Sequence, residues 1–529
     1  MKRPGRWLKS QGPQLAGFPW LLGIGLLLAY VGVRILALPS DVAASPSFTH
    51  DSAYVGIVAR NLLEGRGYVN DANWLLFLKP DSLPMYFHNA NPLYPTLTAA
   101  VMPFAGLDAA RAAAIVSILG SVLIGVGTFF LLRAFRPGYW LPTAGAAAAV
   151  LFPANWHISY ALMPDALATG LVVCFLALVA RARVGWHWWA AGAVLGLAWL
   201  TRSSSSLVVP PVALWMLWRR GMRGGVLGGV RIGIAALVVI SPWLVHTARV
   251  RGSPFASDAG FYWLMDYHAS RDGREQDQYY RSLDTPPTTG EVLRREGKEV
   301  VAFAAGGVGV TIRRAAAGLA MQSHFAAVLL VGAFIASALA VRRGGLGPET
   351  AFVVLLWVGT IAALAVRGPH AEPRYFSVGN TLLVCVLLAP FFVQLGARRR
   401  WLMAPAIAYA LLVVVPQDVS TTRAMAGRDR SLEEFRASAV ATASTMPAAT
   451  SVISHLPYMF TYHTGRPAVS PPYPGRQDLL NVMAQYHAPV VLLPTDSVGY
   501  YYPGAPGSLA PDLRVAAQFG RFSLLRLHN

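Results

Sequence analysis

Four ionisable residues stand at or beside the ends of long apolar stretches, where a membrane chain seldom keeps charge: Asp51, Asp165, Arg202 and Arg374. Ionisable groups at membrane depth are costly and by default suggest function. A carboxylate can accept the proton of an attacking hydroxyl group as a general base. A guanidinium group can bind two phosphate oxygens at once. Two acids and two arginines on one face would combine both chemistries.

Each of these residues also has a purely structural explanation. Asp51 stands where the N-cap of the helix in HDSAYV belongs, and Asp165 in MPDAL could cap the helix that follows it. Arg202 in WLTRSSSS could extend its side chain to the membrane interface. In EPRYF, Glu372 and Arg374 could form a local ion pair. These alternatives remain open from the sequence alone.

The composition indicates a polytopic membrane protein. Of 529 residues, 55% are hydrophobic and 13% are charged, and the mean hydropathy is +0.45. Soluble domains carry about 25% charged residues. The net charge of +19 comes from short Lys/Arg clusters between apolar stretches. That pattern is typical of topology signals and contact with anionic lipid headgroups, so we expect membrane lipids as partners and no nucleic acid.

The apolar stretches predict about eleven membrane-spanning helices. Basic clusters flank alternate spans and all fall on one side, which the positive-inside rule makes cytoplasmic. The basic N-terminus MKRPGRWLKS precedes an apolar stretch too long for a cleaved signal peptide, so we predict an uncleaved signal anchor. The predicted spans are 17–38, 109–132, 139–158, 162–180, 187–201, 205–218, 226–247, 322–341, 350–366, 376–396 and 401–416.

Three larger segments would then face outward: the loop 39–91, the loop 248–320 and the tail 417–529. In the tail, TSVISHL, APVVLLPT and RFSLLRL predict strands, and SLEEFRASAVATAS predicts a helix. We therefore expect a transmembrane domain, 1–416, and a small extracytoplasmic α/β domain, 417–529. The two cysteines, Cys174 and Cys385, lie inside apolar stretches, which excludes a disulfide framework.

The first outer loop begins with FTHDSAYVGIVARNLLEGRGYVND, in which Tyr54, Val58 and Leu62 recur every four residues. This spacing predicts an amphipathic helix that lies on the outer membrane surface. KPDSLPMYFHNANPLYP follows, with Lys79 and His88, as a polar platform beside the lipid. The alternative for this second stretch is a solvated loop of turn residues.

The order of these motifs resembles the GT-C superfamily of membrane glycosyltransferases, and most closely the bacterial branch related to protein O-mannosyltransferases and the aminoarabinose transferase of lipid A. Two features depart from the pattern. Ser52 follows Asp51 where many members have a glutamate, and HNANPLYP lacks the basic residue that relatives often carry before the prolines. The motifs, within residues 15–400, are HDSAYVGIVARNLLEGRGY, NPLYPTLTAAVMPFAG, AARAAAIVSILGS, MPDAL, LTRSSSSLVVPP and EPRYF.

The resemblance implies an inverting hexosyl- or pentosyltransferase of a bacterial inner membrane. It would move a sugar from a polyprenyl-phosphate carrier to a lipid, glycan or protein acceptor outside the cytoplasm. Asp51 is the expected general base, and Arg202 and Arg374 are expected to bind the donor phosphate. Asp165 would orient the acceptor, or join a divalent-metal site with Asp51 and His88, although no cofactor is expected to be required. The expected supporting residues are Glu372, Tyr375, Tyr54, Lys79 and His88.

Two other classes of protein compete with this interpretation. A transporter or flippase for a lipid-linked or polar substrate would also have many spans and intramembrane charges. Transporters place key polar residues near the bilayer midplane, whereas here they cluster at the outer ends of spans. A receptor or scaffold would leave the polar platform of the first loop unexplained. A test is whether Asp51, Asp165, Arg202 and Arg374 line one outer cavity.

Overall fold

The computed structural model describes about two thirds of the chain, and four of the predicted spans lie almost wholly outside it: 322–341, 350–366, 376–396 and 401–416. The count of about eleven spans therefore stays a prediction. The described ranges, besides isolated residues, are 18–74, 82–86, 91–135, 139–151, 153–182, 185–254, 267–269, 271–272, 289–320, 427–472, 476–498 and 513–527.

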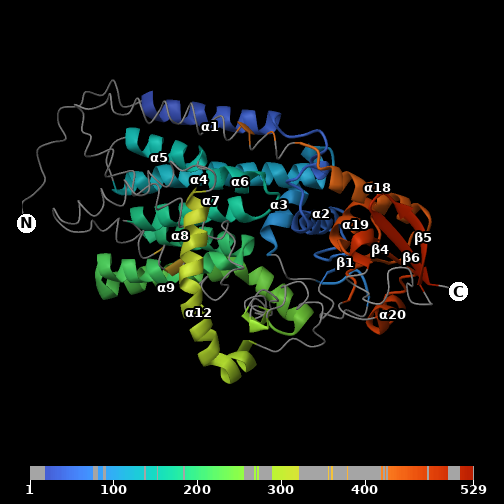
Figure 1. Ribbon diagram of the computed structural model, residues 1–529. Helices are drawn as coiled ribbons and strands as arrows, with labels where there is room; N and C mark the ends of the chain where they lie inside the picture. Colours follow the sequence, from blue (N-terminus) through green and yellow to red (C-terminus); the bar gives the residue numbers. More distant parts are fainter. Residues whose placement is uncertain are drawn as a thin grey trace, which may run out of the picture.

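A bundle of apolar helices forms the larger part of the described structure (Figure 1). Two segments, Ala109–Phe135 and Ser203–Arg251, are long and apolar enough to cross a membrane, and α7 and α8 have 17 residues each, the lower limit for a span. The helices of the bundle are α1 (Phe18–Leu36), α4 (Ala109–Phe135), α5 (Trp140–Leu151), α6 (Pro153–Tyr160), α7 (Asp165–Arg181), α8 (Gly185–Thr201) and α9 (Val209–Arg251).

The helix α9 is two helices that reverse direction at Gly221, where φ is 68° and ψ is 171°. This left-handed conformation favours glycine, because a Cβ atom would be strained there. The two arms then lie against each other: a Cβ at Gly225 would come within 3.0 Å of the Leu217 backbone, and one at Gly228 within 2.9 Å of Met216. The break falls between the predicted spans 205–218 and 226–247, in agreement with their separation into two helices.

Small residues allow the helices of the bundle to pack closely. A Cβ at Gly120 of α4 would lie 2.4 Å from the backbone nitrogen of Leu167 of α7. A Cβ at Gly192 of α8 would lie 2.3 Å from the carbonyl oxygen of Ile232 of α9. Such contacts are typical of membrane helices, which associate by close packing because lipid supplies no hydrophobic drive between them.

The two ends of the bundle carry different side chains. One end is basic and has exposed tryptophans, with Trp186 61% and Trp218 59% exposed. At the other end of α9, Trp243 packs against Tyr68 and His246. The rise from Gly221 to Trp243, about 22 residues, corresponds to about 33 Å, close to the thickness of a hydrocarbon core. Aromatic belts mark both membrane interfaces. The arginines of the basic end are Arg181, Arg219, Arg220 and Arg223.

A six-stranded sheet stands at the end of the bundle away from this basic cluster (Figure 1), with strand order β1-β3-β2-β4-β6-β5. It confirms the predicted strands in TSVISHL, APVVLLPT and RFSLLRL, which are β2, β4 and β6. The first loop contributes β1, which pairs in parallel with β3. The strands are β1 (Ala72–Asn73), β2 (Val452–Ser454), β3 (Ala468–Val469), β4 (Val490–Pro494), β5 (Leu513–Phe519) and β6 (Phe522–Leu527).

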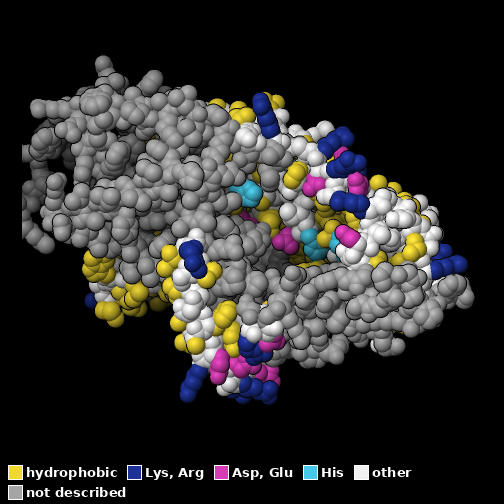
Figure 2. Space-filling model, viewed as in Figure 1, with side chains coloured by type: hydrophobic (Ala, Val, Ile, Leu, Met, Phe, Trp, Pro, Cys, Tyr) yellow, Lys and Arg dark blue, Asp and Glu magenta, His cyan; other side chains and the backbone are white. Residues whose placement is uncertain are grey.

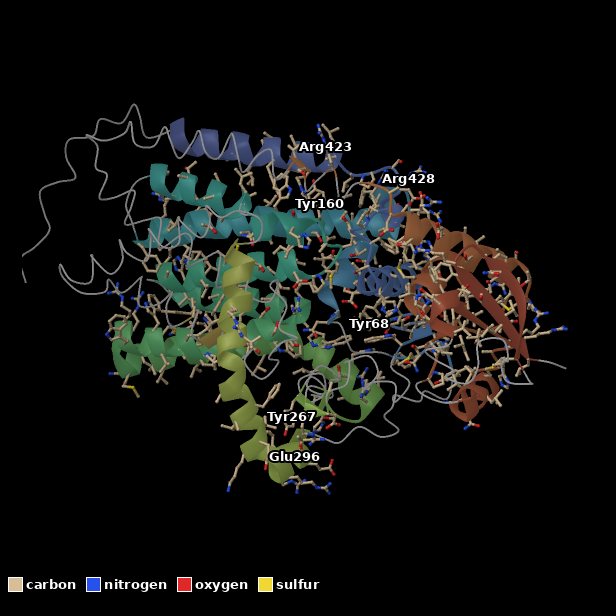
Figure 3. The ribbon with its side chains drawn as sticks, in the orientation of Figure 1. Tyr68, Tyr160, Tyr267, Glu296, Arg423 and Arg428 are labelled. Carbon is tan, nitrogen blue, oxygen red and sulfur yellow. The ribbon has the colours of Figure 1, made fainter. Side chains whose placement is uncertain are left out.

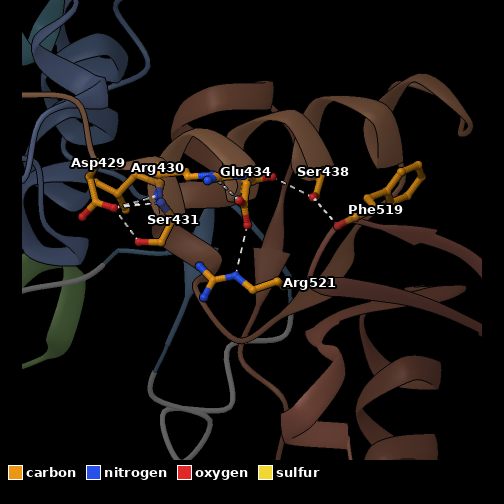
Figure 4. A network of polar contacts seen from close by, with 8 residues as sticks. Asp429, Arg430, Ser431, Glu434, Ser438, Phe519 and Arg521 are labelled. Carbon is orange, nitrogen blue, oxygen red and sulfur yellow. Dashed lines mark hydrogen bonds and ion pairs between the residues drawn. The ribbon is translucent and has the colours of Figure 1, made fainter.

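The helix α18 (Arg430–Ser444) confirms the helix predicted in the tail, and its polar contacts fix it to the sheet (Figure 4). The carboxylate of Asp429 accepts hydrogen bonds from the backbone and hydroxyl of Ser431, at 2.8 and 2.6 Å, and so caps the helix. Arg521, in the turn between β5 and β6, donates to Glu434 at 3.0 Å. The hydroxyl of Ser438 donates to the carbonyl oxygens of Glu434 and Phe519.

The helix α2 (His50–Leu63) corrects one expectation, because it does not lie on a membrane surface. Nine of its residues are buried, and they cover all sides of the helix. It packs against α3 (Leu93–Val101), α4 and the C-terminal helix α19 (Pro457–Thr464). A Cβ at Gly56 would come within 2.5 Å of the ring of Tyr462. The Tyr54 stripe therefore meets protein, supplied by a segment about 400 residues further along the chain.

Hydrogen bonds fix the same contact between the first loop, the bundle and the C-terminal domain. The guanidinium of Arg60 donates to the carbonyl oxygen of Tyr462 at 3.1 Å. The hydroxyl of Tyr462 accepts from the backbone of Ala110, at 3.2 Å, and donates to Asp108 at 3.5 Å. Burial raises the pKa of Tyr462, so its hydroxyl keeps the proton that it donates.

The loop 248–320, predicted to face outward, contains a helix that the sequence analysis did not predict, α12 (Thr289–Ala320). It runs across the direction of the bundle helices in Figure 1 and changes direction at Glu296. The carboxylate of Glu296 accepts from Arg271 at 2.7 Å and lies 3.1 Å from a ring nitrogen of His268. The 3-10 helices and the remaining helix are η2 (Val42–Ala44), η4 (Met102–Ala105), η5 (Ser203–Val208), η10 (Thr495–Ser497) and α20 (Arg476–Gln485).

Candidate active site

Asp51 lies in the first turn of α2, and its side chain is exposed. The N-cap of this helix is Thr49, whose hydroxyl accepts a hydrogen bond from the backbone of Ser52 at 3.3 Å. The capping explanation for Asp51 is therefore wrong. A carboxylate in the first turn of a helix lies near the positive end of the helix dipole, which favours its ionised form. Such a group can take a proton from a hydroxyl group that approaches from outside.

Aromatic side chains surround the start of α2. The ring of His50 stacks on Tyr458 of α19, with 4.4 Å between centroids, and meets Trp74 at 5.7 Å. The hydroxyl of Tyr54 lies 3.5 Å from that of Tyr68. Tyr68, labelled in Figure 3 where the bundle meets the C-terminal domain, contacts Trp243 of α9 at 4.9 Å. These rings, three of them buried, pack around the helix start that carries Asp51.

Asp165 and Arg202 form an ion pair. Asp165 is the first residue of α7 and follows the N-cap position Pro164, so it does not cap the helix. Arg202 occupies the turn between α8 and η5. The side chain of Asp165 is 3% exposed and that of Arg202 is 26% exposed. Arg202 therefore turns inward to a buried acid, and the explanation that it extends to the membrane interface is wrong.

Only one oxygen of the buried carboxylate is used by this ion pair. Its Oδ1 atom accepts from Arg202, while Oδ2 has no hydrogen-bond partner among the described residues. A buried acceptor without a partner costs free energy, and native structures rarely keep one without a reason. Oδ2 is therefore an acceptor for a group that is not part of the described chain.

The helix α3 connects the surroundings of the two aspartates. It packs against α2 on one side and against α8 on the other. Asn91, just before α3, donates a hydrogen bond to the carbonyl oxygen of Trp199, three residues before Arg202. The hydroxyl of Tyr94, in α3, lies 2.7 Å from that of Ser117, which donates to the carbonyl oxygen of Ala161 at 3.1 Å in the segment before Asp165. The end of the polar platform is thus linked to the two backbone segments that carry Asp165 and Arg202.

The surface is hollowed at this place. Figure 2 shows acidic and histidine side chains gathered in a hollow over α2 and α3, between the bundle and the C-terminal domain. The arrangement gives an exposed carboxylate, a buried carboxylate with a spare oxygen and a cation that is partly accessible to an anion.

A metal site is not supported by the described part of this arrangement. Arg202 already neutralises the charge of Asp165, which a divalent ion would need as a ligand. Among the described residues, no group of three or more His, Cys, Asp and Glu side chains could hold a metal ion. His88, the third candidate ligand, lies outside the described residues.

Several predicted site residues lie outside the described part of the chain: Lys79, His88, Glu372, Arg374 and Tyr375. Their roles stay predictions, and so does the local Glu372–Arg374 pair. The structure brings Asp165 and Arg202 together, and it sets Asp51 on a separate helix that α3 links to them.

Of the aromatic residues around Asp51, the sequence analysis selected Tyr54 and missed His50, Trp243, His246 and Tyr458. His50 directly precedes the acid, and Trp243 and His246 stand three apart near the C-terminal end of α9. That spacing places two rings on one helical face, so the sequence could have predicted this aromatic pair. Tyr458 offered no such signal, because it joins the site through the fold of a distant domain.

Comparisons with known proteins rest on three-dimensional structure. No family model and no curated protein sequence matches this chain. The oligosaccharyltransferase of Archaeoglobus fulgidus, crystallised with zinc and sulfate, superposes with a TM-score of 0.59 and 14% identity, over 89% of this chain and 69% of that chain. Its apo form gives 0.58 and 11% identity, over 93% and 71%.

ArnT from Cupriavidus metallidurans also aligns over most of both chains. The apo form covers 95% of this chain and 98% of its own, at 14% identity, with a TM-score of 0.46. The form bound to undecaprenyl phosphate covers 96% and 98%, at 13% identity, with a TM-score of 0.45. The likeness to the oligosaccharyltransferase is the one that bears on the fold. It shows that this chain shares the fold of that oligosaccharyltransferase over the aligned residues, which agrees with the resemblance to the GT-C superfamily that the order of the motifs indicates.

Proposed function

We propose that this protein is an inverting glycosyltransferase that moves a sugar from a polyprenyl-phosphate donor to an acceptor hydroxyl group on the extracytoplasmic side of the membrane. The observation that carries the proposal is the ion pair of Arg202 with the buried Asp165, linked through α3 to the helix of the exposed Asp51, in a GT-C fold. The sugar, a hexose or a pentose, and the acceptor are not assigned.

In this reaction the acceptor oxygen attacks the anomeric carbon of the sugar from the face opposite the phosphate. Asp51 accepts the hydroxyl proton as the new glycosidic bond forms. The bond between the anomeric carbon and the phosphate oxygen breaks, and the polyprenyl phosphate leaves with the electron pair. Because the attack and the departure occur on opposite faces, the configuration at the anomeric carbon inverts.

The departing phosphate gains negative charge, which a fixed cation can stabilise. Arg202 is suited to this role because Asp165 fixes one side of its guanidinium while about a quarter of its side chain stays accessible. Arg374 is proposed as the second cation, with Glu372 and Tyr375 beside it. Oδ2 of Asp165 can accept a hydrogen bond from a substrate hydroxyl. Asp165 therefore positions both Arg202 and the substrate.

The remaining roles are proposed on the resemblance of the motifs. Tyr54 supports α2 from its buried face, and Lys79 and His88, outside the described residues, support substrate binding. Residues 1–416 form the transmembrane domain, with the N-terminus in the cytoplasm, and residues 417–529 lie outside. No step is assigned to a metal ion, because the carboxylate of Asp165 is already paired with Arg202.

The test is transfer by the purified protein in liposomes. Radiolabelled polyprenyl-phosphate sugars of several kinds are supplied with envelope extracts as acceptors, and label in the acceptor fraction is counted. A glycosyltransferase moves label to an acceptor and releases polyprenyl phosphate in equal amount. Movement of the intact lipid-linked sugar across the bilayer, with no label on any acceptor, would instead establish the transporter.

A further inference from the structure

A groove of about 720 Å³ lies on the far side of α4 from α7. Gly120 and Gly127 of α4 face α7, whereas Gly125 and Phe129 line the groove. None of its lining residues belongs to the candidate active site. The lining residues come from α1, α4, α5 and the start of α6, with two from the segment before α18, and include Gly23, Ala29, Val33, Phe130, Ala147 and Arg423.

The dimensions of the groove suit one hydrocarbon chain. On α1 the lining extends from Gly23 to Ala37, a rise of about 21 Å, which exceeds one leaflet of a core about 30 Å thick. The walls of the groove are apolar except at one end.

Positive charge is concentrated at that end. Arg423 lines the groove, and Figure 3 labels it beside the C-terminal end of α1. It precedes Asp429 by six residues, and the backbone of Asp429 donates to the carbonyl oxygen of Ala44 at 3.0 Å. Ala44 follows the end of α1 at Leu36 by eight residues. Arg423 therefore lies toward the end of the bundle nearest the C-terminal domain.

A second cation lies behind the wall of the groove. Arg34 of α1 is 1% exposed, and its guanidinium carbon lies 4.8 Å from the ring centroid of Trp156 and 6.0 Å from that of Tyr30. Both rings line the groove. Its Nη2 atom donates to the hydroxyl of Ser159 at 2.7 Å. Two guanidinium groups therefore make this end of an apolar groove electropositive, and charge is weakly screened in low dielectric.

We propose that this groove binds one anionic phospholipid from the leaflet on the side of the C-terminal domain. An acyl chain lies between α1, α4 and α5, and the headgroup phosphate pairs with Arg423. The site is separate from the donor site at Arg202, because α4 stands between them. The occupant is a resident lipid of the membrane and takes no part in the transfer.

Native mass spectrometry of the purified protein tests this proposal, with phosphatidylglycerol and phosphatidylcholine offered in equal amounts. The wild type should retain phosphatidylglycerol in preference. Arg423→Gln should lower that preference about fivefold, the effect of one basic residue at an anionic headgroup. The matched control is Arg430→Gln, because Arg430 is 93% exposed on α18 and pairs with Glu434 outside the groove. The control should retain the wild-type preference.

A second arm tests the place of binding. Photoactivatable phosphatidylglycerol should crosslink to peptides of α1 and α5, and Ala147→Phe should reduce that crosslinking by filling the groove. Equal retention of the two lipids by the wild type, or equal loss in Arg423→Gln and Arg430→Gln, would overturn the proposal. Crosslinks of a polyprenyl phosphate probe to the same peptides, with none from phosphatidylglycerol, would assign the groove to the carrier lipid and also overturn it.

Discussion

Two aspartates begin helices in this molecule, and their surroundings differ in almost every respect. Asp51 in the first turn of α2 is exposed beside an aromatic layer, whereas Asp165 at the start of α7 is buried and paired with Arg202. From sequence both look like acids beside the end of a span. An exposed carboxylate can exchange a proton with a substrate, while a buried paired one fixes the position of a cation. The same residue type therefore takes two roles.

The largest expected effect on stability comes from breaking the buried pair. Arg202→Gln leaves the Asp165 carboxylate buried without its cation, which should lower the free energy of unfolding by about 3–5 kcal/mol. The double variant Asp165→Asn with Arg202→Gln removes both charges and should recover most of that loss. Thermal unfolding in detergent, followed by size-exclusion chromatography, measures both.

The sugar-transfer assay tests the same variants through a second quantity, the KM for the donor. The double variant should fold well yet bind the donor weakly, with a raised KM, because the cation for the phosphate is gone. Recovery of wild-type KM together with stability would show that Arg202 serves the fold alone.

A smaller effect on stability is expected from His463 of α19, the helix that packs against α2. Burial lowers the pKa of His463 to about 4, with Arg436 and Arg60 adding to the shift and Asp41 opposing it. The unfolded chain takes up the proton near pH 6.5, so stability is fully present above that pH and is lost as the pH falls toward 4. Over this pH range the free energy of unfolding should fall by about 3 kcal/mol.

Unfolding temperatures at pH 7.5 and pH 5 check this dependence. His463→Gln should flatten the difference. The matched control is His487→Asn, an exposed position of the same domain with φ of 50°, which asparagine tolerates. A control that flattens the pH dependence as much as His463→Gln would assign it to the domain as a whole.

The smallest effect concerns the contact of α18 with the sheet. Asp429→Ala removes the cap of the helix and should cost about 1 kcal/mol, whereas Asp429→Asn keeps an acceptor and should cost less. Neither change should alter the loss of stability that Arg202→Gln causes, because the bundle does not depend on this cap. Chemical denaturation of wild type and variants measures the difference, and an Asn variant as weak as the Ala variant would exclude capping as the cause.

The sequence predicts those parts of the fold that depend on local pattern. Apolar length gives α4 and α8, and the separation of 205–218 from 226–247 anticipates the reversal at Gly221. Alternating apolar residues give β2, β4 and β6. The two-residue strands β1 and β3 have no periodicity to detect. The strand β1 exists only because the first loop meets β3, in a domain that follows it by nearly 400 residues.

The candidate site shows the same division. The motif order selects Asp51, Asp165 and Arg202, and the fold pairs the last two. Local spacing predicts an amphipathic α2, and it cannot show that α19 covers the exposed stripe, because Tyr462 and Tyr458 arrive from the C-terminal domain. The assignment of the helix cap to Asp51 is wrong for a similar local reason: Thr49, two residues earlier, starts the helix.

The most direct test of the account is the rate of sugar transfer by Asp51→Asn beside Glu64→Gln. Glu64 is an exposed acid at the other end of α2, so its variant controls for loss of charge on that helix. The account predicts that Asp51→Asn lowers the rate about 100- to 10,000-fold with unchanged folding, while Glu64→Gln transfers as the wild type does. Transfer by Asp51→Asn within a few-fold of the wild type would contradict the assignment of Asp51 as the base.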